Sequence, residues 1–198
     1  RQVTRLAVRR ILTNGTLGFA GYLTSHGEAS RDAISALDGA GLRAVVGRVA
    51  MDRNAPDDLL REDHGRARLT PRPSPIMPVA PRSRIEVSAN PRFAVACSEE
   101  LLAEIGWLRR DRPDLCVQTH LAESGEECAV VDGLFPQARD YTDVYDHAGL
   151  LGPRTLLAHC VHLSEDEWRV IAERRGGVVH CPTAKTFHRT GLLDLESA

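Results

Sequence analysis

Short apolar runs and amphipathic stretches follow one another along the whole chain. The apolar runs predict six buried strands, at residues 15–22, 43–50, 85–89, 115–121, 155–159 and 178–182. Apolar positions at helical spacing predict helices at 30–40, from 98 to at least 108, at 125–134 and at 164–175. Two of these helices begin at a serine that acidic residues follow, which is typical of a capped first turn. Because strand and helix alternate, the pattern predicts parallel strands joined by right-handed crossovers, and hence an α/β fold.

One segment interrupts the alternation. Five prolines lie between Thr70 and Pro81, where a helix would be expected between the second and third strands. Proline removes a backbone donor and disfavours helix in the residue before it. We therefore predict a loop over 70–81, preceded at most by a short helix within 57–66.

Length and composition fit one globular domain of 198 residues, 42% hydrophobic and 26% charged, with a formal net charge of −2. This balance does not favour a nucleic-acid or anionic-membrane partner, and no apolar run approaches the roughly 18 residues of a membrane helix. The five cysteines are odd in number and none are in CxxC spacing, which favours reduced thiols in a cytoplasmic protein. The start of the chain, from Arg1 to Arg10, is basic and polar, so we expect no secretory signal there. Because the chain does not begin with Met, we expect it to be a fragment or a processed or cloned piece.

Candidate catalytic and metal-binding side chains lie where the predicted strands end. His120 and Glu123 follow one strand and His159 ends the next, while His180 ends the last and is equally compatible with a structural role. In a (β/α)8 barrel the C-terminal strand ends converge on the mouth that holds the active site. Imidazoles there can bind Zn²⁺, and a carboxyl group can transfer protons. For the other histidines we expect ordinary hydrogen-bonding roles; they are His26, His64, His147, His162 and His188.

A set of short motifs makes the pattern more specific. In chain order they are Asn14-Gly15-Thr16, Met51-Asp52-Arg53-Asn54-Ala55-Pro56, Pro91-Arg92-Phe93, Thr119-His120-Leu121-Ala122-Glu123, Phe135-Pro136, Tyr141-Thr142-Asp143-Val144-Tyr145-Asp146, Ala158-His159 and His180-Cys181-Pro182. Their order resembles that of the guanine deaminases of the amidohydrolase superfamily, over nearly the whole chain except 57–84.

The resemblance implies a (β/α)8 TIM barrel of the metallo-dependent hydrolase type that holds one catalytic zinc. Residues 1–198 would form a partial barrel domain with strands 2–7 present and the first and eighth missing. The implied activity is the zinc-dependent hydrolytic deamination of guanine to xanthine and ammonia. The implied partner is a small purine substrate, and the protein could assemble as a homodimer.

The resemblance also implies a role for individual residues. His120 would be a zinc ligand that also contacts the substrate, and Glu123 would transfer a proton to the bound purine. His159 would hold the attacking water or the tetrahedral intermediate. Arg92 would be a buried donor to the oxygen of guanine, and Phe93 would line the pocket. An aromatic wall suits a flat ring, and a guanidinium suits a carbonyl acceptor.

Two features of the family are not found in the sequence. The chain contains no His-x-His pair, and Asp194 does not match the aspartate expected on the eighth strand. A catalytic zinc needs three protein ligands. We therefore expect the other ligands to lie outside this chain and the 198 residues alone to be inactive. The alternatives are a non-catalytic barrel remnant that acts as a structural or interaction module, and a deaminase of a pterin, a triazine or another purine. Pro91-Arg92-Phe93 favours guanine over these heterocycles.

Overall fold

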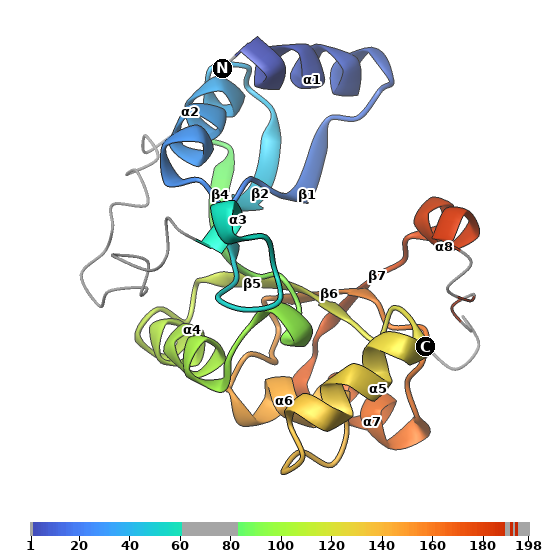
Figure 1. Cartoon of the computed structure of the whole chain (residues 1–198). Helices are drawn as coiled ribbons and strands as arrows, with labels where there is room; N and C mark the ends of the chain where they lie inside the picture. The colour runs from blue at the N-terminus through green and yellow to red at the C-terminus, as the bar shows by residue number, and fades with distance from the viewer. Residues whose placement is uncertain (1, 61–82, 189–190, 192, 194–198) are drawn as a thin grey trace.

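The computed structural model describes residues 2–60, 83–188, 191 and 193, and it forms one curved parallel sheet with helices packed beside it (Figure 1). The predicted proline-rich loop at 70–81 lies outside the described residues. The strands run in the order β1-β2-β4-β5-β6-β7, every pair is parallel, and the short β3 pairs with β4. The strands are β1 (Gly18–Tyr22), β2 (Arg43–Gly47), β3 (Val49–Ala50), β4 (Ile85–Pro91), β5 (Cys116–Leu121), β6 (Thr155–His159) and β7 (Gly177–Val179).

The six predicted strands and the parallel α/β fold are confirmed, with corrections at the edges. The second strand divides after Gly47 into β2 and β3. The last strand is shorter than predicted, because it ends at Val179 and Pro182 begins a helix. Proline is accepted in the first turn of a helix, where its missing N–H costs nothing, so His180 and Cys181 connect β7 to α8 and do not end a strand.

The predicted helices are present, and three more occur that the pattern did not predict: α1, α6 and α8. The helices are α1 (Gln2–Thr13), α2 (Gly27–Asp38), α3 (Asp57–Leu60), α4 (Glu99–Asp111), α5 (Gly125–Leu134), α6 (Tyr141–His147), α7 (Glu165–Arg174) and α8 (Pro182–His188), with a 3₁₀ turn η1 at Ala94–Ala96. Within the described residues, none of these helices has the length and apolarity needed to cross a membrane.

Two apolar clusters lie at the two ends of the sheet. In Figure 1, α1 and α2 pack beside β1 and β2, whereas α4 to α7 lie around β5 and β6. Val8 of α1 and Leu37 of α2 are buried in the first cluster, which explains why a basic N-terminal segment forms a helix. The second and larger cluster contains Leu102 and Ile105 of α4. Burial of these faces supplies the stability that short helices lack by themselves.

Serines begin three of the helices, as the sequence predicted for two of them. Ser98, Ser124 and Ser164 each accept a hydrogen bond from the backbone N–H three residues ahead. The Glu167 carboxylate in turn accepts a hydrogen bond from the backbone N–H of Ser164, which completes a capping box. These caps fix where the chain leaves each strand-end loop and enters the next helix.

A buried polar network joins four strands below the candidate site. The Asn90 amide donates to the carbonyl oxygens of Gly21 and Gly47, both at 3.3 Å. Ser88 donates to Asn90 at 2.7 Å, and Gln118 donates to Ser88 at 2.7 Å. Because an unpaired buried polar group is costly, this network favours one arrangement of β1, β2, β4 and β5.

A pair of helix glycines provides a test of the packing between α4 and the end of α6. A Cβ on Gly106 would overlap the carbonyl oxygen of Ala148, whereas a Cβ on Gly133 meets nothing. We expect Gly106→Ala to lower the free energy of unfolding by about 1–3 kcal/mol, the usual cost of overpacking. Gly133→Ala should raise it by about 0.4–1 kcal/mol, since it only restricts the unfolded chain. Urea titration of the two variants measures both changes, and a stable Gly106→Ala protein would contradict the observed contact.

Candidate active site

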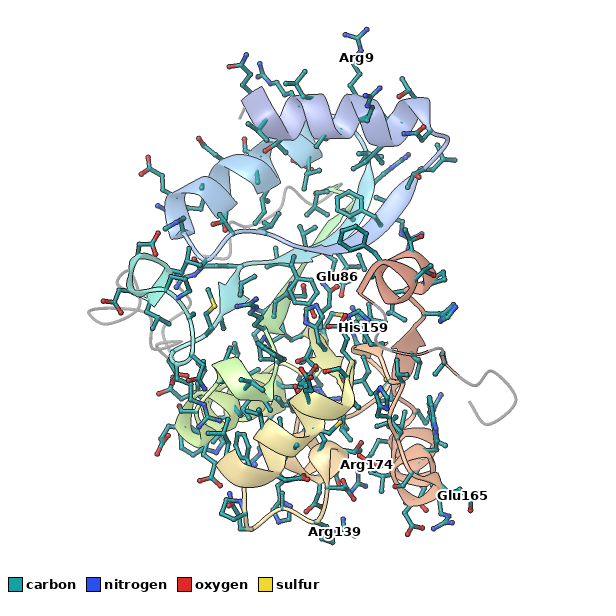
Figure 2. All side chains as sticks on the ribbon, turned by 45° about the vertical axis from the view of Figure 1, so that its right-hand side comes forward. Arg9, Glu86, Arg139, His159, Glu165 and Arg174 are labelled. Atoms are coloured by element: carbon teal, nitrogen blue, oxygen red, sulfur yellow. The ribbon has the colours of Figure 1, made fainter. Side chains whose placement is uncertain are left out.

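The site lies at the C-terminal ends of β4, β5 and β6. Because the three strands are parallel, their C-terminal ends share one edge of the sheet, and Leu121 pairs with His159 across β5 and β6. His159 lies in the interior of the molecule, whereas Arg9, Arg139 and Glu165 are at its periphery (Figure 2). The strands are thus parallel, as the sequence predicted, and the ends of β5 and β6 lie side by side at one edge of the sheet.

His120 is held by the residue that the sequence assigned to substrate binding. Its ring Nδ1 lies 2.6 Å from the carbonyl oxygen of Arg92, and its backbone N–H donates to the same oxygen at 3.3 Å. A carbonyl can only accept, so Nδ1 carries the proton and Nε2 keeps its lone pair. Burial lowers the pKa of His120, which also favours the neutral imidazole that a metal requires.

His159 and Glu123 approach one another beside His120. The His159 Nε2 lies 3.4 Å from the Glu123 Oε2, and the rings of His120 and His159 are stacked with centroids 5.4 Å apart. The backbone at Ala122 and His159 is left-handed, with φ values of 49° and 78°. Non-glycine residues adopt this conformation at a cost of about 1–3 kcal/mol, and such residues cluster at functional sites. The two turns bring the carboxylate and the second imidazole together.

Arg92 and Phe93 follow β4 and face the same region. The Arg92 guanidinium lies 5.2 Å from the centre of the Phe93 ring and 3.9 Å from the sulfur of Met51. The side chain of Arg92 is exposed, which corrects the expectation of a buried arginine. No carboxylate of the described residues forms an ion pair with it. Phe93 is half-buried and also packs against the small apolar cluster of Met51, Leu60 and Ala96. Its ring is therefore shared between this core and the Arg92 guanidinium.

Sequence reasoning missed Tyr22, and it left the role of His180 open. The Tyr22 ring lies 4.7 Å from that of His120, and its hydroxyl is buried without a hydrogen-bond partner among the described residues. Tyr22 ends β1, so the strand-end rule applied to the histidines could have found it. His180 is exposed after β7, and no hydrogen bond, ion pair or ring contact joins it to His120 within the described residues.

The Asp52-Arg53-Asn54 loop supports the segment that follows Phe93. The Asp52 carboxylate accepts from the backbone N–H of Ser98 at 2.7 Å, and the Arg53 guanidinium donates to the Ala94 carbonyl at 2.9 Å. The Asn54 amide donates to the Val95 carbonyl at 2.7 Å. This motif, whose role the sequence left open, therefore fixes η1 and the start of α4.

The donor set fits one corner of a metal site. His120 presents a neutral ring with Nε2 available, and its other nitrogen is held by a carbonyl oxygen in the manner typical of metal-binding histidines. Within the ranges that the structure describes, no three His, Cys, Asp or Glu side chains form a group that could hold a metal ion. His120 could thus serve as one ligand, and a complete site needs further ones.

Comparison with known proteins places these residues in a family. The model of the amidohydrolase family matches residues 1–198. Guanine deaminase from Escherichia coli K12 is 34% identical over the whole chain, which covers 45% of that protein, and guanine deaminase from Rattus norvegicus is 35% identical over 98% of the chain and 43% of its own length. The chain therefore spans a little under half the length of these relatives.

Solved structures show the same likeness. The E. coli guanine deaminase structure superposes on the whole chain with a TM-score of 0.87 at 33% identity, and the chain covers 46% of it. A guanine deaminase from C. acetobutylicum, solved with guanine bound in its active site, superposes on 94% of the chain with a TM-score of 0.78 at 29% identity, and 44% of that protein is covered. The parallel sheet described above is thus an incomplete TIM barrel of the amidohydrolase type, with β1 and β7 at its ends.

Proposed function

We propose, because the chain belongs to the amidohydrolase family, that it forms the ring-binding and proton-transferring part of a zinc-dependent guanine deaminase. Guanine deaminases are among its relatives by both sequence and structure. The observation that carries the proposal is the carbonyl oxygen of Arg92, which binds both the backbone and the ring of His120. That one atom ties the substrate-binding segment to the metal ligand, next to Glu123 and His159.

Recognition of the purine falls to Arg92 and Phe93. Guanine has a ring carbonyl oxygen that adenine lacks, and a guanidinium is a charged donor to such an acceptor. The exposed position of Arg92 leaves its outer N–H groups accessible to a ligand. The half-buried ring of Phe93 provides an apolar surface for a flat heterocycle, and its contact with the Met51 cluster keeps that surface in place.

Glu123 and His159 have the geometry for proton transfer. In the reaction, water adds to the carbon that bears the amino group, a proton is delivered to the ring and ammonia leaves, so that guanine and water give xanthine and ammonia. Glu123 would carry the proton to the ring, and His159, 3.4 Å away, would orient the attacking water and the tetrahedral carbon. The half-buried carboxylate can reach both a ligand and solvent.

His120 would hold the zinc through Nε2, and the remaining ligands would come from residues beyond those described. Zinc bound there would lower the pKa of water to about 7 and so supply a nucleophile at neutral pH. The Arg92 carbonyl contributes by fixing the tautomer and orientation of the His120 ring.

A substrate panel tests this proposal. The full-length gene product, with its zinc content measured, is assayed for ammonia release from guanine, adenine, a pterin and a triazine. We expect guanine to be deaminated with a kcat/KM at least about 10⁴-fold above that of adenine, because a site built for a hydrogen-bonding group rejects analogues that lack it. Removal of zinc by a chelator should abolish turnover, and zinc should restore it.

Two outcomes favour the alternatives. A folded, zinc-loaded protein that deaminates none of the four heterocycles would support a non-catalytic barrel module. Faster deamination of the pterin or the triazine would assign the same chemistry to a different ring.

A further inference from the structure

The hydroxyl of Tyr145 is a fully buried polar group behind the candidate site. It donates to the carbonyl oxygen of His120 at 2.8 Å, and it accepts from the backbone N–H of Ala94 at 3.0 Å and from the Thr119 hydroxyl at 3.1 Å. A longer fourth contact joins it to the Tyr141 hydroxyl at 3.4 Å. A phenolic hydroxyl has one proton and two acceptor positions, so the three shorter bonds use its whole capacity.

These bonds join two segments that the sheet itself leaves apart. β4 and β5 pair through Ser88 with Cys116 and through Ala89 with Val117, before either strand reaches the site. Beyond those pairs, the Arg92 carbonyl and the Tyr145 hydroxyl connect the two strand ends. The relative position of the Arg92–Phe93 segment and His120 therefore depends on the backbone bond from His120 to the Arg92 carbonyl together with side-chain hydrogen bonds from the His120 ring and the Tyr145 hydroxyl.

The helix that carries Tyr145 is itself anchored on both sides. The Tyr141 hydroxyl donates to Glu127 of α5 at 2.7 Å, and the Thr142 hydroxyl donates to Glu167 of α7 at 3.1 Å. Tyr141 also accepts from the Ala94 N–H, at the longer distance of 3.3 Å. Because α6 is fixed to its neighbours, Tyr145 is a rigid reference point for the site rather than a side chain that follows it.

We propose that Tyr145 is a positioning residue that sets the distance between the guanine-binding segment at Arg92–Phe93 and the metal ligand His120. The inference rests on the proposed function for its effect on turnover. Tyr145 does not touch the substrate; it acts through Ala94, which follows Phe93, and through the carbonyl of His120. Removal of its hydroxyl leaves the ring in the core and breaks the bond to the His120 carbonyl and the shorter of the two bonds from the Ala94 N–H.

Tyr145→Phe in the full-length gene product is expected to lower kcat/KM for guanine by about 10- to 100-fold, since a displacement of about 1 Å at a reacting group can cost 10²-fold. Thr119→Val, which removes one of the three bonds, should give a smaller loss in the same direction and serves as a second variant if Tyr145→Phe does not fold. Ile105→Val, a buried change on α4, is the control for stability. An equal loss of kcat/KM in a control of equal melting temperature would overturn the inference.

A double-mutant cycle with Arg92→Ala separates positioning from general stability. If Tyr145 acts through the Arg92 segment, Tyr145→Phe should cost at least threefold less in the Arg92→Ala background than in the unsubstituted protein, because coupled residues are not additive. Independent sites would instead give a double variant whose fold-loss in kcat/KM equals the product of the two single fold-losses. That result would contradict the inference.

Amide hydrogen exchange gives an answer that does not depend on catalysis. Tyr145→Phe should speed exchange in a peptide covering 92–97 by roughly tenfold, the equivalent of one hydrogen bond, and leave α4 unchanged. If the unsubstituted protein fails to deaminate guanine, the proposed function is wrong, and this comparison still decides the positioning role. Unchanged exchange at 92–97, or equal loss of protection in α4, would overturn it.

Discussion

Glu123→Gln in the full-length gene product is expected to lower kcat for guanine by roughly 10²–10⁴-fold, the usual contribution of general acid–base catalysis. The change keeps the size and shape of the side chain and removes the group that can carry a proton. Glu123 lies 3.4 Å from His159 at a half-buried position where two left-handed turns hold it. Zinc content and the melting temperature should stay within error of the unsubstituted protein, so that the loss is chemical.

Glu126→Gln is the matched control, because Glu126 is an exposed carboxylate three residues further along, in the first turn of α5. Its kcat should remain within about twofold, as expected for a surface change. Near-normal turnover of Glu123→Gln would reduce Glu123 to a structural carboxylate and remove it from the mechanism.

Arg92→Ala is expected to raise KM for guanine strongly while affecting kcat much less. Loss of a hydrogen bond from a charged donor costs about 1.5–3 kcal/mol, which corresponds to roughly 10- to 150-fold in affinity. The Arg92 side chain is exposed beside the Phe93 ring, where we expect its guanidinium to contact the purine. A group that binds the ground state and the transition state equally raises KM and spares kcat.

Two further arginine variants sharpen this result. Arg92→Lys keeps the positive charge but loses the planar guanidinium group. Its KM for guanine should therefore lie between that of the unsubstituted protein and that of Arg92→Ala. Arg110→Ala removes an exposed arginine of α4 and should leave KM unchanged. Steady-state kinetics with zinc content checked in each variant provide the comparison, and an unchanged KM for Arg92→Ala would take Arg92 out of the substrate site.

Periodic patterns in the sequence predicted most of the sheet and its helices. Runs rich in apolar residues such as 115–121 and 155–159 became β5 and β6, because strands buried on both faces carry mostly apolar side chains. The polar Gln118 and Thr119 of β5 are buried with hydrogen-bond partners. The strand-end rule then placed His120, Glu123 and His159 together, since parallel strands share the direction in which they end.

Helix α6 could not be predicted from propensity. Tyr141, Val144 and Tyr145 are poor helix formers, and an isolated seven-residue helix is unstable in water. The helix forms because these side chains are buried against α5, α7 and β5, and because the Asp140 carboxylate caps its first turn. These side chains do have helical spacing, but the stretch covers only about two turns, which is shorter than the window over which such a period identifies a helix.

The finer geometry of the site was also outside the reach of sequence reasoning. The left-handed φ values at Ala122 and His159 occur at residues that give no sign of them, because such values usually mark glycine. The bond from the Arg92 carbonyl to the His120 ring joins residues 28 positions apart. The exposure of Arg92, contrary to expectation, follows from its place just after the last residue of β4 rather than within it.

A crystal structure of the zinc-loaded, full-length gene product with guanine bound tests the central claim most directly. It should show the His120 Nε2 about 2.0–2.1 Å from zinc, and a Glu123 oxygen within about 2.6–3.2 Å of a ring nitrogen. The Arg92 guanidinium should donate to the purine oxygen over the edge of Phe93. Guanine bound away from the ends of β4, β5 and β6, or zinc held without His120, would contradict the account.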